Sequence, residues 1–218
     1  MDGNGRWAEA RSLPVEAGHR EGTRALRRTV EAALELGIGS LTVYAFSTEN
    51  WLRPPAEVDS LMEIFSETIE RELPDLAKQG VRTRFIGRRD RAPLELQDRM
   101  ADLELRTADR ERLQLWIAFD YGGRAELADA AKALIASGIS PEEVDEDVLA
   151  VYLYAPEMPD PDLLIRASGE LRISNFLLWQ LAYAELVFVD RLWPDFGEED
   201  LRRAVTEYAQ RHRRFGGR

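Results

Sequence analysis

Ser-Leu-Thr-Val-Tyr-Ala-Phe, at residues 40–46, has the composition of a buried strand, with β-branched and aromatic side chains over a short run. A helical pattern with one apolar face precedes it at 23–36, and a broad apolar stripe at helical spacing follows at 57–78. A strand between two helices is typical of βαβ units. This stretch therefore predicts a mainly parallel sheet covered by helices on both faces.

The rest of the chain continues the alternation. Further strands are expected at 81–86, 113–119, 163–166 and 186–189, and further helices at 94–106, 124–137, 145–153 and 198–213. The sequence contains no repeat, low-complexity tract or linker. It therefore predicts an α/β fold in a single domain over residues 1–218.

Composition excludes several classes of protein. The net charge of −11 argues against a nucleic-acid partner. The absence of Cys excludes a disulfide scaffold and suits the cytoplasm, and His19 and His212 are too few for a His-based metal site. Gln180 and Glu185 interrupt the most apolar run, 175–189, which therefore predicts no membrane span.

Asp-Gly-Asn-Gly-Arg-Trp, at residues 2–7, carries the densest chemical signal. Gly3 and Gly5 permit unusual backbone angles and close approach of N–H groups to a ligand, so the turn can cradle a phosphate. Arg6 adds a fork of charged donors. Asp2 is better suited to hold Mg²⁺ than phosphate. The alternative is an ordinary turn rich in Gly, Asn and Asp.

Polar segments follow the predicted strands at 47–54, 120–124, 166–176 and 183–185. Ligands of open α/β sheets lie beyond the carboxyl ends of the strands. We therefore expect these segments to gather at one edge of the sheet together with residues 2–7.

Several motifs, in order, carry a family resemblance. They are Asp-Gly-Asn-Gly-Arg-Trp (2–7), Ser-Thr-Glu-Asn-Trp-x-Arg-Pro (47–54), Tyr-Gly-Gly-Arg (121–124), Arg-x-Ser-Gly-Glu-x-Arg-x-Ser-Asn-Phe-x-x-Trp-Gln (166–180), and Tyr-Ala-Glu (183–185) followed by Trp-Pro-Asp-Phe (193–196). Together they resemble a bacterial undecaprenyl diphosphate synthase, a cis-prenyltransferase, from Met1 to the Arg-Arg-Phe-Gly-Gly at 213–217.

The resemblance implies Mg²⁺-dependent condensation of isopentenyl diphosphate onto an allylic diphosphate, typically farnesyl diphosphate, with each new double bond cis. It implies metal ligation by Asp2 and Glu185, and proton removal by Asn50 and Ser47 relaying to a diphosphate oxygen. The substrate-binding residues that it implies are Gly3, Asn4, Gly5, Arg6, Trp7, His19, Ser47, Thr48, Glu49, Trp51, Arg53, Arg166, Arg172, Ile173 and Ser174.

The resemblance also implies a hydrophobic product tunnel along the 57–78 stripe, with Ala45 and Ala118 leaving it open. It implies a homodimer in which Arg214–Gly216 reaches the partner's site, and peripheral membrane contact for product release. Family members carry an apolar strand that ends at the Met before the Asp-Gly-Asn-Gly motif, so we expect the first strand to be truncated here and Met1 not to be the natural start.

The chain departs from the family pattern at four positions, Val15, Leu171, Trp116 and Asp120. Trp116 and Asp120 occupy strand positions that are often Asn in the family. Val15 replaces an Arg that helps to bind the allylic diphosphate, Leu171 replaces a commonly polar residue, and Trp116 is expected to narrow the tunnel and shorten the product.

Other interpretations stay open. Trp7 and Trp51 also suit core aromatics, His19 a helix cap, Arg53 a solvated loop and Glu185 a solvent-facing position. As a whole, the chain could be a synthase of shorter or medium-length products. It could also be a non-catalytic subunit of a heteromeric cis-prenyltransferase, or an unrelated phosphate-binding hydrolase. Neither of the last two suits a chain that keeps the metal-binding Asp and shows no positioned nucleophile.

Overall fold

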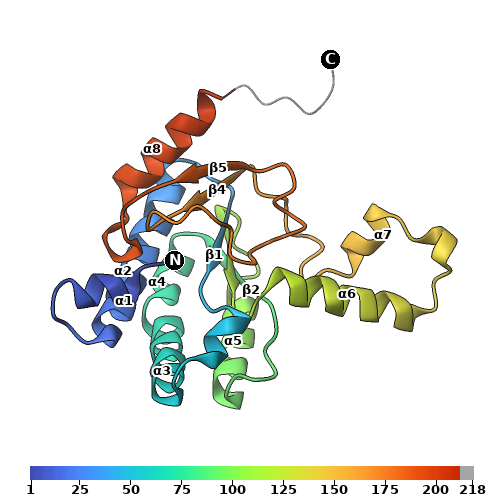
Figure 1. The fold of residues 1–218 in the computed structure, drawn as a ribbon, viewed down its shortest axis with the longest axis horizontal. Coiled ribbons are helices and arrows are strands. Elements are labelled where there is room, and N and C mark those ends of the chain that lie inside the picture. Colours follow the sequence, from blue (N-terminus) through green and yellow to red (C-terminus); the bar gives the residue numbers. More distant parts are fainter. Residues whose placement is uncertain (212–218) are drawn as a thin grey trace.

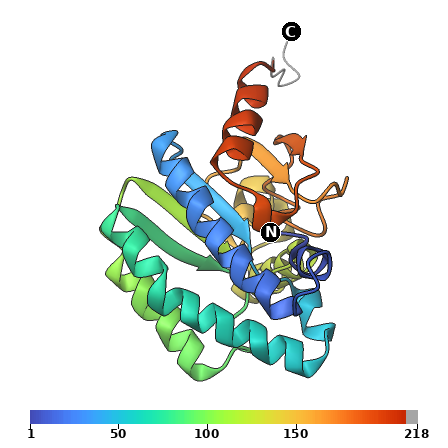
Figure 2. The same cartoon turned by 90° about the vertical axis from the view of Figure 1, so that its left-hand side faces the viewer.

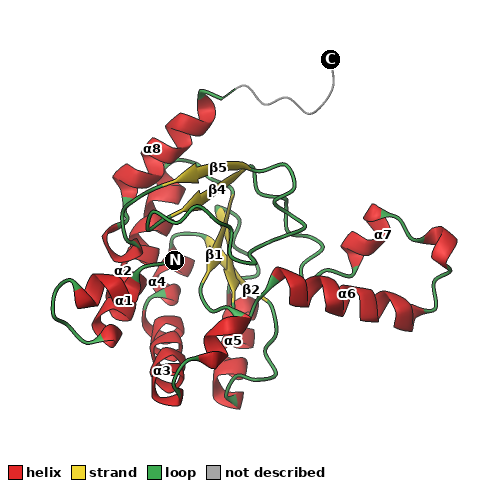
Figure 3. Ribbon diagram, viewed as in Figure 1, coloured by secondary structure: helices red, strands yellow, loops and turns green. Residues whose placement is uncertain are grey.

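The computed structural model describes residues 1–211 and contains two sheets of parallel strands (Figures 1 and 3). In the larger, β3 (Leu113–Ala118) lies between β1 (Ser40–Tyr44) and β2 (Val81–Ile86). The smaller pairs β4 (Leu163–Arg166) with β5 (Glu185–Phe188). The predicted parallel α/β architecture is confirmed.

Helices surround these strands. They are α1 (Asn4–Glu9), α2 (Val15–Glu35), α3 (Pro55–Arg71), α4 (Leu73–Lys78), α5 (Leu94–Arg106), α6 (Gly123–Ser137), α7 (Glu146–Val151) and α8 (Glu198–Ala209), with short 3₁₀ turns at Thr48–Leu52, Pro141–Glu143 and Trp193–Asp195. The helix α2 lies diagonally across the view in Figure 2 and packs against α1, α3 and α8, whereas α4 and α5 pack against β2. The helices α6 and α7 project from the body of the molecule (Figure 1).

Alternate side chains of β3 enter two different cores. Leu113, Leu115 and Ile117 pack with the cluster that includes α2, α3 and α5, whereas Trp116 and Ala118 belong to a second cluster on the other face. All five are buried. The central strand therefore reads as continuously apolar because helices and loops cover both of its faces.

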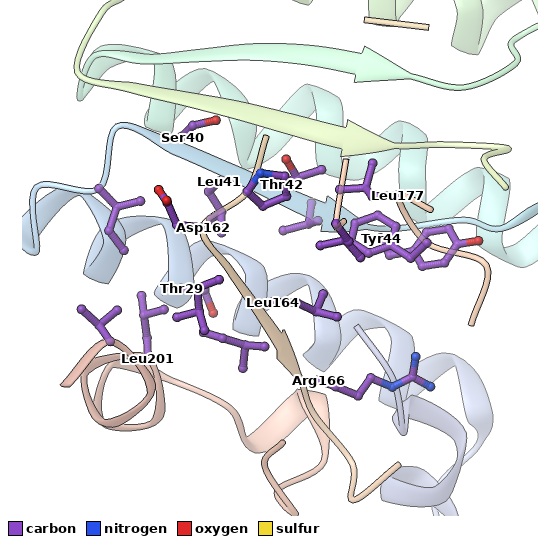
Figure 4. Close-up of a pocket in the computed structure, with 18 of the residues that line it drawn as sticks. Thr29, Ser40, Leu41, Thr42, Tyr44, Asp162, Leu164, Arg166, Leu177 and Leu201 are labelled. Atoms are coloured by element: carbon purple, nitrogen blue, oxygen red, sulfur yellow. The ribbon is translucent and has the colours of Figure 1, made fainter. Parts of the chain in front are cut away.

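A cleft of about 700 Å³ separates β1 from β4. Figure 4 shows side chains of both strands turned toward it, with Arg166 at one end and Leu201 of α8 at the other. Met1 also lines this cleft. The strand that the resemblance implies ahead of Met1 stays a prediction.

Several predicted boundaries were wrong. The expected helix at 57–78 is two helices, because Pro74 has no N–H to continue the hydrogen bonding of α3 and its ring clashes with the preceding turn. The last strand begins and ends one residue earlier than predicted, and the helix expected at 198–213 ends at Ala209, with its last two residues outside the described part of the chain.

The chain start differs most from expectation. Residues 2–7 do not form a simple turn, because Asn4 begins α1 and Gly3 before it has a φ of 94°. The helix expected at 23–36 begins at Val15 and contains Gly18 and Gly22. A Cβ at Gly18 would lie 2.1 Å from the carbonyl oxygen of Asn4. These glycines let α1 pack directly against α2.

Across residues 1–211, no helix combines the length and the apolar character needed to cross a bilayer. The apolar stripe at 57–78 packs in the core, and Leu61 is the one member of it that lines the polar pocket described below. Trp116 is buried and lines neither of the two cavities described here. A continuous product tunnel stays a prediction.

Candidate active site

Strand pairing continues past the ends of β1 and β3 and fixes the turn that follows β1. Tyr121 N–H donates to the Phe46 carbonyl at 3.1 Å, and Thr48 N–H donates to the Tyr121 carbonyl at 2.9 Å. Inside the turn, Ser47 N–H donates to Asn50 Oδ1 at 2.9 Å. The amide NH₂ of Asn50 is the part of that side chain left to donate to a ligand.

Residues at the chain start lie beside the carboxyl end of β4. The Asp2 carbonyl accepts a hydrogen bond from Trp193 N–H at 2.9 Å. Its carboxylate accepts one from Arg166 Nη2, at 2.8 Å, and lies 3.5 Å from Arg6 Nη2. Arg6 Nη1 also lies 3.7 Å from Glu170 Oε1, so two guanidinium groups and two carboxylates form one network here.

A pocket of about 440 Å³ lies between the chain start, the turn after β1 and the end of β4. Many of the residues predicted for the site line it: Asp2, Asn4, His19, Ser47, Glu49, Asn50, Arg53, Arg166 and Ser174. The structure thus brings together residues up to 172 positions apart in the sequence, as the strand-exit argument expected.

The charges in this pocket shift the pKa values of its titratable groups. Burial raises the pKa of Asp2, but the Arg166 and Arg6 guanidinium groups and hydrogen bonds from Ser168 and the Gly3 backbone together hold the pKa below its ordinary value, so the side chain is a carboxylate at neutral pH. Burial, with Arg53 nearby, lowers the pKa of His19. His19 is therefore a neutral donor or acceptor at pH 7.

Three buried polar atoms of the pocket have no hydrogen-bond partner: Asn4 Oδ1, His19 Nε2 and Arg166 Nε. Leaving such atoms unpaired costs free energy. Two of the three atoms suit an anionic ligand, because Arg166 Nε donates and His19 Nε2 donates in the neutral tautomer that carries its hydrogen there, whereas Asn4 Oδ1 only accepts.

The pocket also fits Mg²⁺ in the manner usual for phosphate-bound magnesium. Among residues 1–211, no three Asp, Glu or His side chains gather as a metal cluster. Mg²⁺ at phosphate sites usually takes one or two carboxylates and completes its octahedron with phosphate oxygens and water. Asp2 supplies such a carboxylate.

Some predicted substrate residues lie elsewhere. Trp7 Nε1 donates to Asp195 at 2.7 Å under the Arg11 guanidinium, and Trp51 donates to Asp120 at 2.9 Å, so neither indole lines the pocket. Arg172 is exposed and pairs with Glu170. The remaining predicted residues that do not line the pocket are Gly3, Gly5, Arg6, Thr48 and Ile173, of which Ile173 lines the apolar cleft instead.

Glu185 is separated from Asp2 within this chain. It lies beside Leu163 at the start of the β4–β5 pair, whereas Arg166, which holds Asp2, lies beside Phe188 at the other end. Three residues of strand span roughly 10 Å. Glu185 instead pairs with Arg211 at 2.7 Å.

Two pocket residues were missed by the sequence reasoning. Tyr44 ends β1, lines both cavities and donates to the Tyr121 carbonyl at 3.0 Å. Asn175 donates to Glu49 at 2.9 Å and accepts from Arg124 N–H, with a φ of 61°. The Asn of the Ser-Asn-Phe motif could have indicated a tight turn at this position, because Asn tolerates a positive φ better than most residues do.

Known proteins resemble this chain over nearly its whole length, including every residue of the pocket. The family model described as "Putative undecaprenyl diphosphate synthase" matches residues 1–216. This chain belongs to that family. An undecaprenyl diphosphate synthase of Xanthomonas axonopodis pv. citri, specific for farnesyl diphosphate, is 51% identical and aligned over 99% of this chain and 86% of the relative. An isoprenyl transferase of Thermotoga maritima is 48% identical over 100% of this chain and 94% of its own length.

Solved structures of the family share the fold. A lavandulyl diphosphate synthase from Lavandula x intermedia, in complex with dimethylallyl diphosphate, superposes with a TM-score of 0.96 at 36% identity, over 100% of this chain and 95% of that one. A probable undecaprenyl diphosphate synthase from Campylobacter jejuni superposes with a TM-score of 0.81 at 34% identity. The superposition covers 90% of this chain and 92% of that one.

The contact between α1 and α2 yields a first prediction. Gly18→Ala should destabilise the protein by about 1–3 kcal/mol, because the new methyl group must displace the Asn4 backbone. Gly39→Ala is the control, since a Cβ there meets nothing within 4 Å. Thermal unfolding measures both. Equal melting temperatures for the two variants would show that α1 does not depend on close contact with α2.

Proposed function

We propose that this chain is a cis-prenyltransferase that condenses isopentenyl diphosphate onto an allylic diphosphate, farnesyl diphosphate by analogy with its relatives, to give a long Z-polyprenyl diphosphate such as undecaprenyl diphosphate. That product is the precursor of the lipid carrier of cell-wall synthesis. The observation that carries the proposal is the convergence of Asp2, Asn50 and Arg166, from three separate segments, on one polar pocket that Arg53 also lines. Residues 1–218 form one prenyltransferase domain in this proposal.

Residues in the pocket and beside it divide between the two substrates in this proposal. The Gly3–Arg6 segment and His19 hold the allylic diphosphate, whereas Arg166, Arg172 and Ser174 hold the diphosphate of isopentenyl diphosphate. A Cβ at Gly5 would meet nothing within 4 Å, so the backbone there is open to a ligand. Two diphosphates repel each other strongly at short range, and the cations of the pocket offset that repulsion.

The reaction requires stabilisation of a departing pyrophosphate. As the allylic C–O bond breaks, pyrophosphate leaves with the bonding electrons and the double bond of isopentenyl diphosphate forms the new C–C bond. Mg²⁺ at Asp2, when bound, neutralises charge on the leaving group, and the arginines donate to its oxygens. Glu185 remains a candidate for the second protein ligand of Mg²⁺. Its distance from Asp2 within one chain does not by itself support that role.

Loss of a proton completes each cycle. A proton beside a carbocation is strongly acidic, so a weak acceptor suffices. Asn50 and Ser47 relay its proton to a diphosphate oxygen, Ser47 through its hydroxyl and Asn50 by donating its free NH₂ to that oxygen, and the fixed turn that holds both supports this role.

Product analysis tests the proposal. The chain is incubated with farnesyl diphosphate, labelled isopentenyl diphosphate and Mg²⁺, and the products are sized. A ladder ending at a long polyprenyl diphosphate is expected. The structural likeness to a lavandulyl diphosphate synthase favours one alternative, a short-chain synthase. Consumption of dimethylallyl diphosphate with no elongation of farnesyl diphosphate would replace the long-chain proposal with that alternative.

We also propose a cytoplasmic homodimer that contacts the membrane peripherally to release its product. The Arg214–Gly216 segment, which lies outside the described residues, would complete the partner's site. Mixing an Arg214→Ala subunit with an Asp2→Ala subunit should then restore roughly a quarter to a half of the activity, since one hybrid site carries neither change. Hybrid dimers that form but stay inactive would mean that each site is complete within one chain.

A further inference from the structure

A buried carboxylate lies behind the turn that carries Ser47 and Asn50. The side chain of Asp120 is fully buried, and the residue, two positions after the end of β3, has a φ of 45°. An isolated buried carboxylate is costly, and this one is compensated by Arg91, whose Nε donates to it at 2.9 Å and whose Nη2 makes a second contact.

The same carboxylate holds Trp51. The indole Nε1 donates to Asp120 Oδ1 at 2.9 Å, and the Arg91 guanidinium carbon lies 5.0 Å from the centre of the indole ring. On its other side the ring packs edge-on against Phe46 at 5.0 Å. Asp120, Arg91 and Trp51 therefore form a closed triangle, here called the Trp51 clamp.

The clamp holds the turn through Trp51, a residue that does not line the pocket. Asn50 and Arg53 line the pocket, whereas Trp51 between them does not. Because the turn is one short 3₁₀ helix from Thr48 to Leu52, fixing the Trp51 ring fixes the orientation of its neighbour Asn50.

We propose that Asp120 and Arg91 are positioning residues for the condensation, acting through Trp51 to hold Asn50 in its productive orientation. This proposal rests on the proposed function of the pocket. A misplacement of about 1 Å in a reacting group can lower turnover by roughly 10²-fold. The diphosphate contacts assigned to Arg6 and Arg166 belong to other segments, so loss of the clamp should lower kcat and leave the KM for isopentenyl diphosphate nearly unchanged.

Because Asp120 and Arg91 compensate each other's charge, removing both charges should restore part of the activity that is lost when only Arg91 is replaced. Arg91→Met should lower kcat about tenfold to hundredfold, because Asp120 loses its compensating cation and no longer holds Trp51 in place. Asp120→Asn keeps an acceptor for the indole and suits the positive φ. The double variant Asp120→Asn with Arg91→Met should therefore recover at least about fivefold in kcat over Arg91→Met alone.

The chain offers a matched control in the same loop. Arg89 pairs with Glu104 at 2.7 Å and lies 5.8 Å from the centre of the Phe85 ring, so it too combines an ion pair with an aromatic contact. Arg89→Met should lower the melting temperature and leave kcat within about twofold of the unchanged chain.

Steady-state kinetics and one spectroscopic signal test whether Asp120 and Arg91 act through Trp51. The Trp51 indole N–H resonance, assigned by its loss in Trp51→Phe, should shift in Arg91→Met and return toward its original position in the double variant, together with kcat. If Arg91→Met does not fold, Trp51→Phe and the double variant carry the test. The proposal would be overturned if Arg91→Met changed kcat no more than Arg89→Met does at a comparable loss of melting temperature. Lack of activity in the unchanged chain would instead contradict the proposed function.

Discussion

Replacing Asp2 by Asn is expected to lower kcat by at least about 10²-fold while leaving the fold intact. The carboxylate lies in the pocket, stays ionised because the neighbouring guanidinium groups and hydrogen bonds lower its pKa, and is the ligand that we propose for Mg²⁺. Asn has the same size and keeps one oxygen acceptor, so packing around the residue should change little. Steady-state turnover across a Mg²⁺ titration measures the effect.

The ion pairs of Asp2 predict an opposite effect on binding. The carboxylate neutralises part of the charge of Arg166 and Arg6. Without Mg²⁺, Asp2→Asn should therefore bind inorganic pyrophosphate more tightly than the unchanged chain does. Glu9→Gln, at the exposed end of α1, is the control and should change neither kcat nor the affinity for pyrophosphate. Near-normal turnover of Asp2→Asn would remove Asp2 from the chemistry.

Replacing Arg166 by Met should lower kcat/KM for isopentenyl diphosphate by at least about 30-fold. The side chain is largely buried, and its Nε lacks a partner while Nη2 binds Asp2. Asp2 is 37% exposed, so solvent screens part of the lost ion pair, and the loss of the guanidinium donors to the diphosphate makes the larger contribution. The kcat/KM of Arg166→Lys should lie between those of the unchanged chain and Arg166→Met, because lysine keeps the positive charge but lacks the planar guanidinium fork.

A second arginine of the sheets provides the control for Arg166. Arg84 on β2 pairs with Glu157 and lies 4.8 Å from the centre of the Trp116 ring, away from the polar pocket. Arg84→Met should lower the melting temperature with kcat/KM preserved. If both Met variants lost activity only in proportion to stability, Arg166 would be a structural residue.

Much of the fold could be predicted because strands buried on both faces have a distinctive composition. The bounds of β2 and β4 agree with prediction to the residue, and β3 to within one residue. The early start of α2 could not be predicted, because Gly18 and Gly22 read as helix breakers when their contact with Asn4 is unknown. Tertiary packing overrides helix propensity at such positions.

The site was predictable in its residues and less so in their geometry. Motifs at strand exits correctly gathered Asp2, Asn50 and Arg166 around one pocket. The sequence could not show that Trp51 turns away from that pocket toward Asp120, because a 3₁₀ turn sends neighbouring side chains in different directions. Nor could it show the separation of Glu185 from Asp2, which depends on the register of β4 with β5.

Simultaneous binding of both diphosphates tests the account most directly. Isopentenyl diphosphate is titrated calorimetrically, with Mg²⁺, into the chain saturated with an unreactive thio analogue of farnesyl diphosphate. We expect one isopentenyl diphosphate to bind per chain while the analogue stays bound, and Arg166→Met to weaken that second binding selectively. Mutually exclusive binding of the two ligands would contradict the account, because the pocket would then hold a single diphosphate and could not join two substrates.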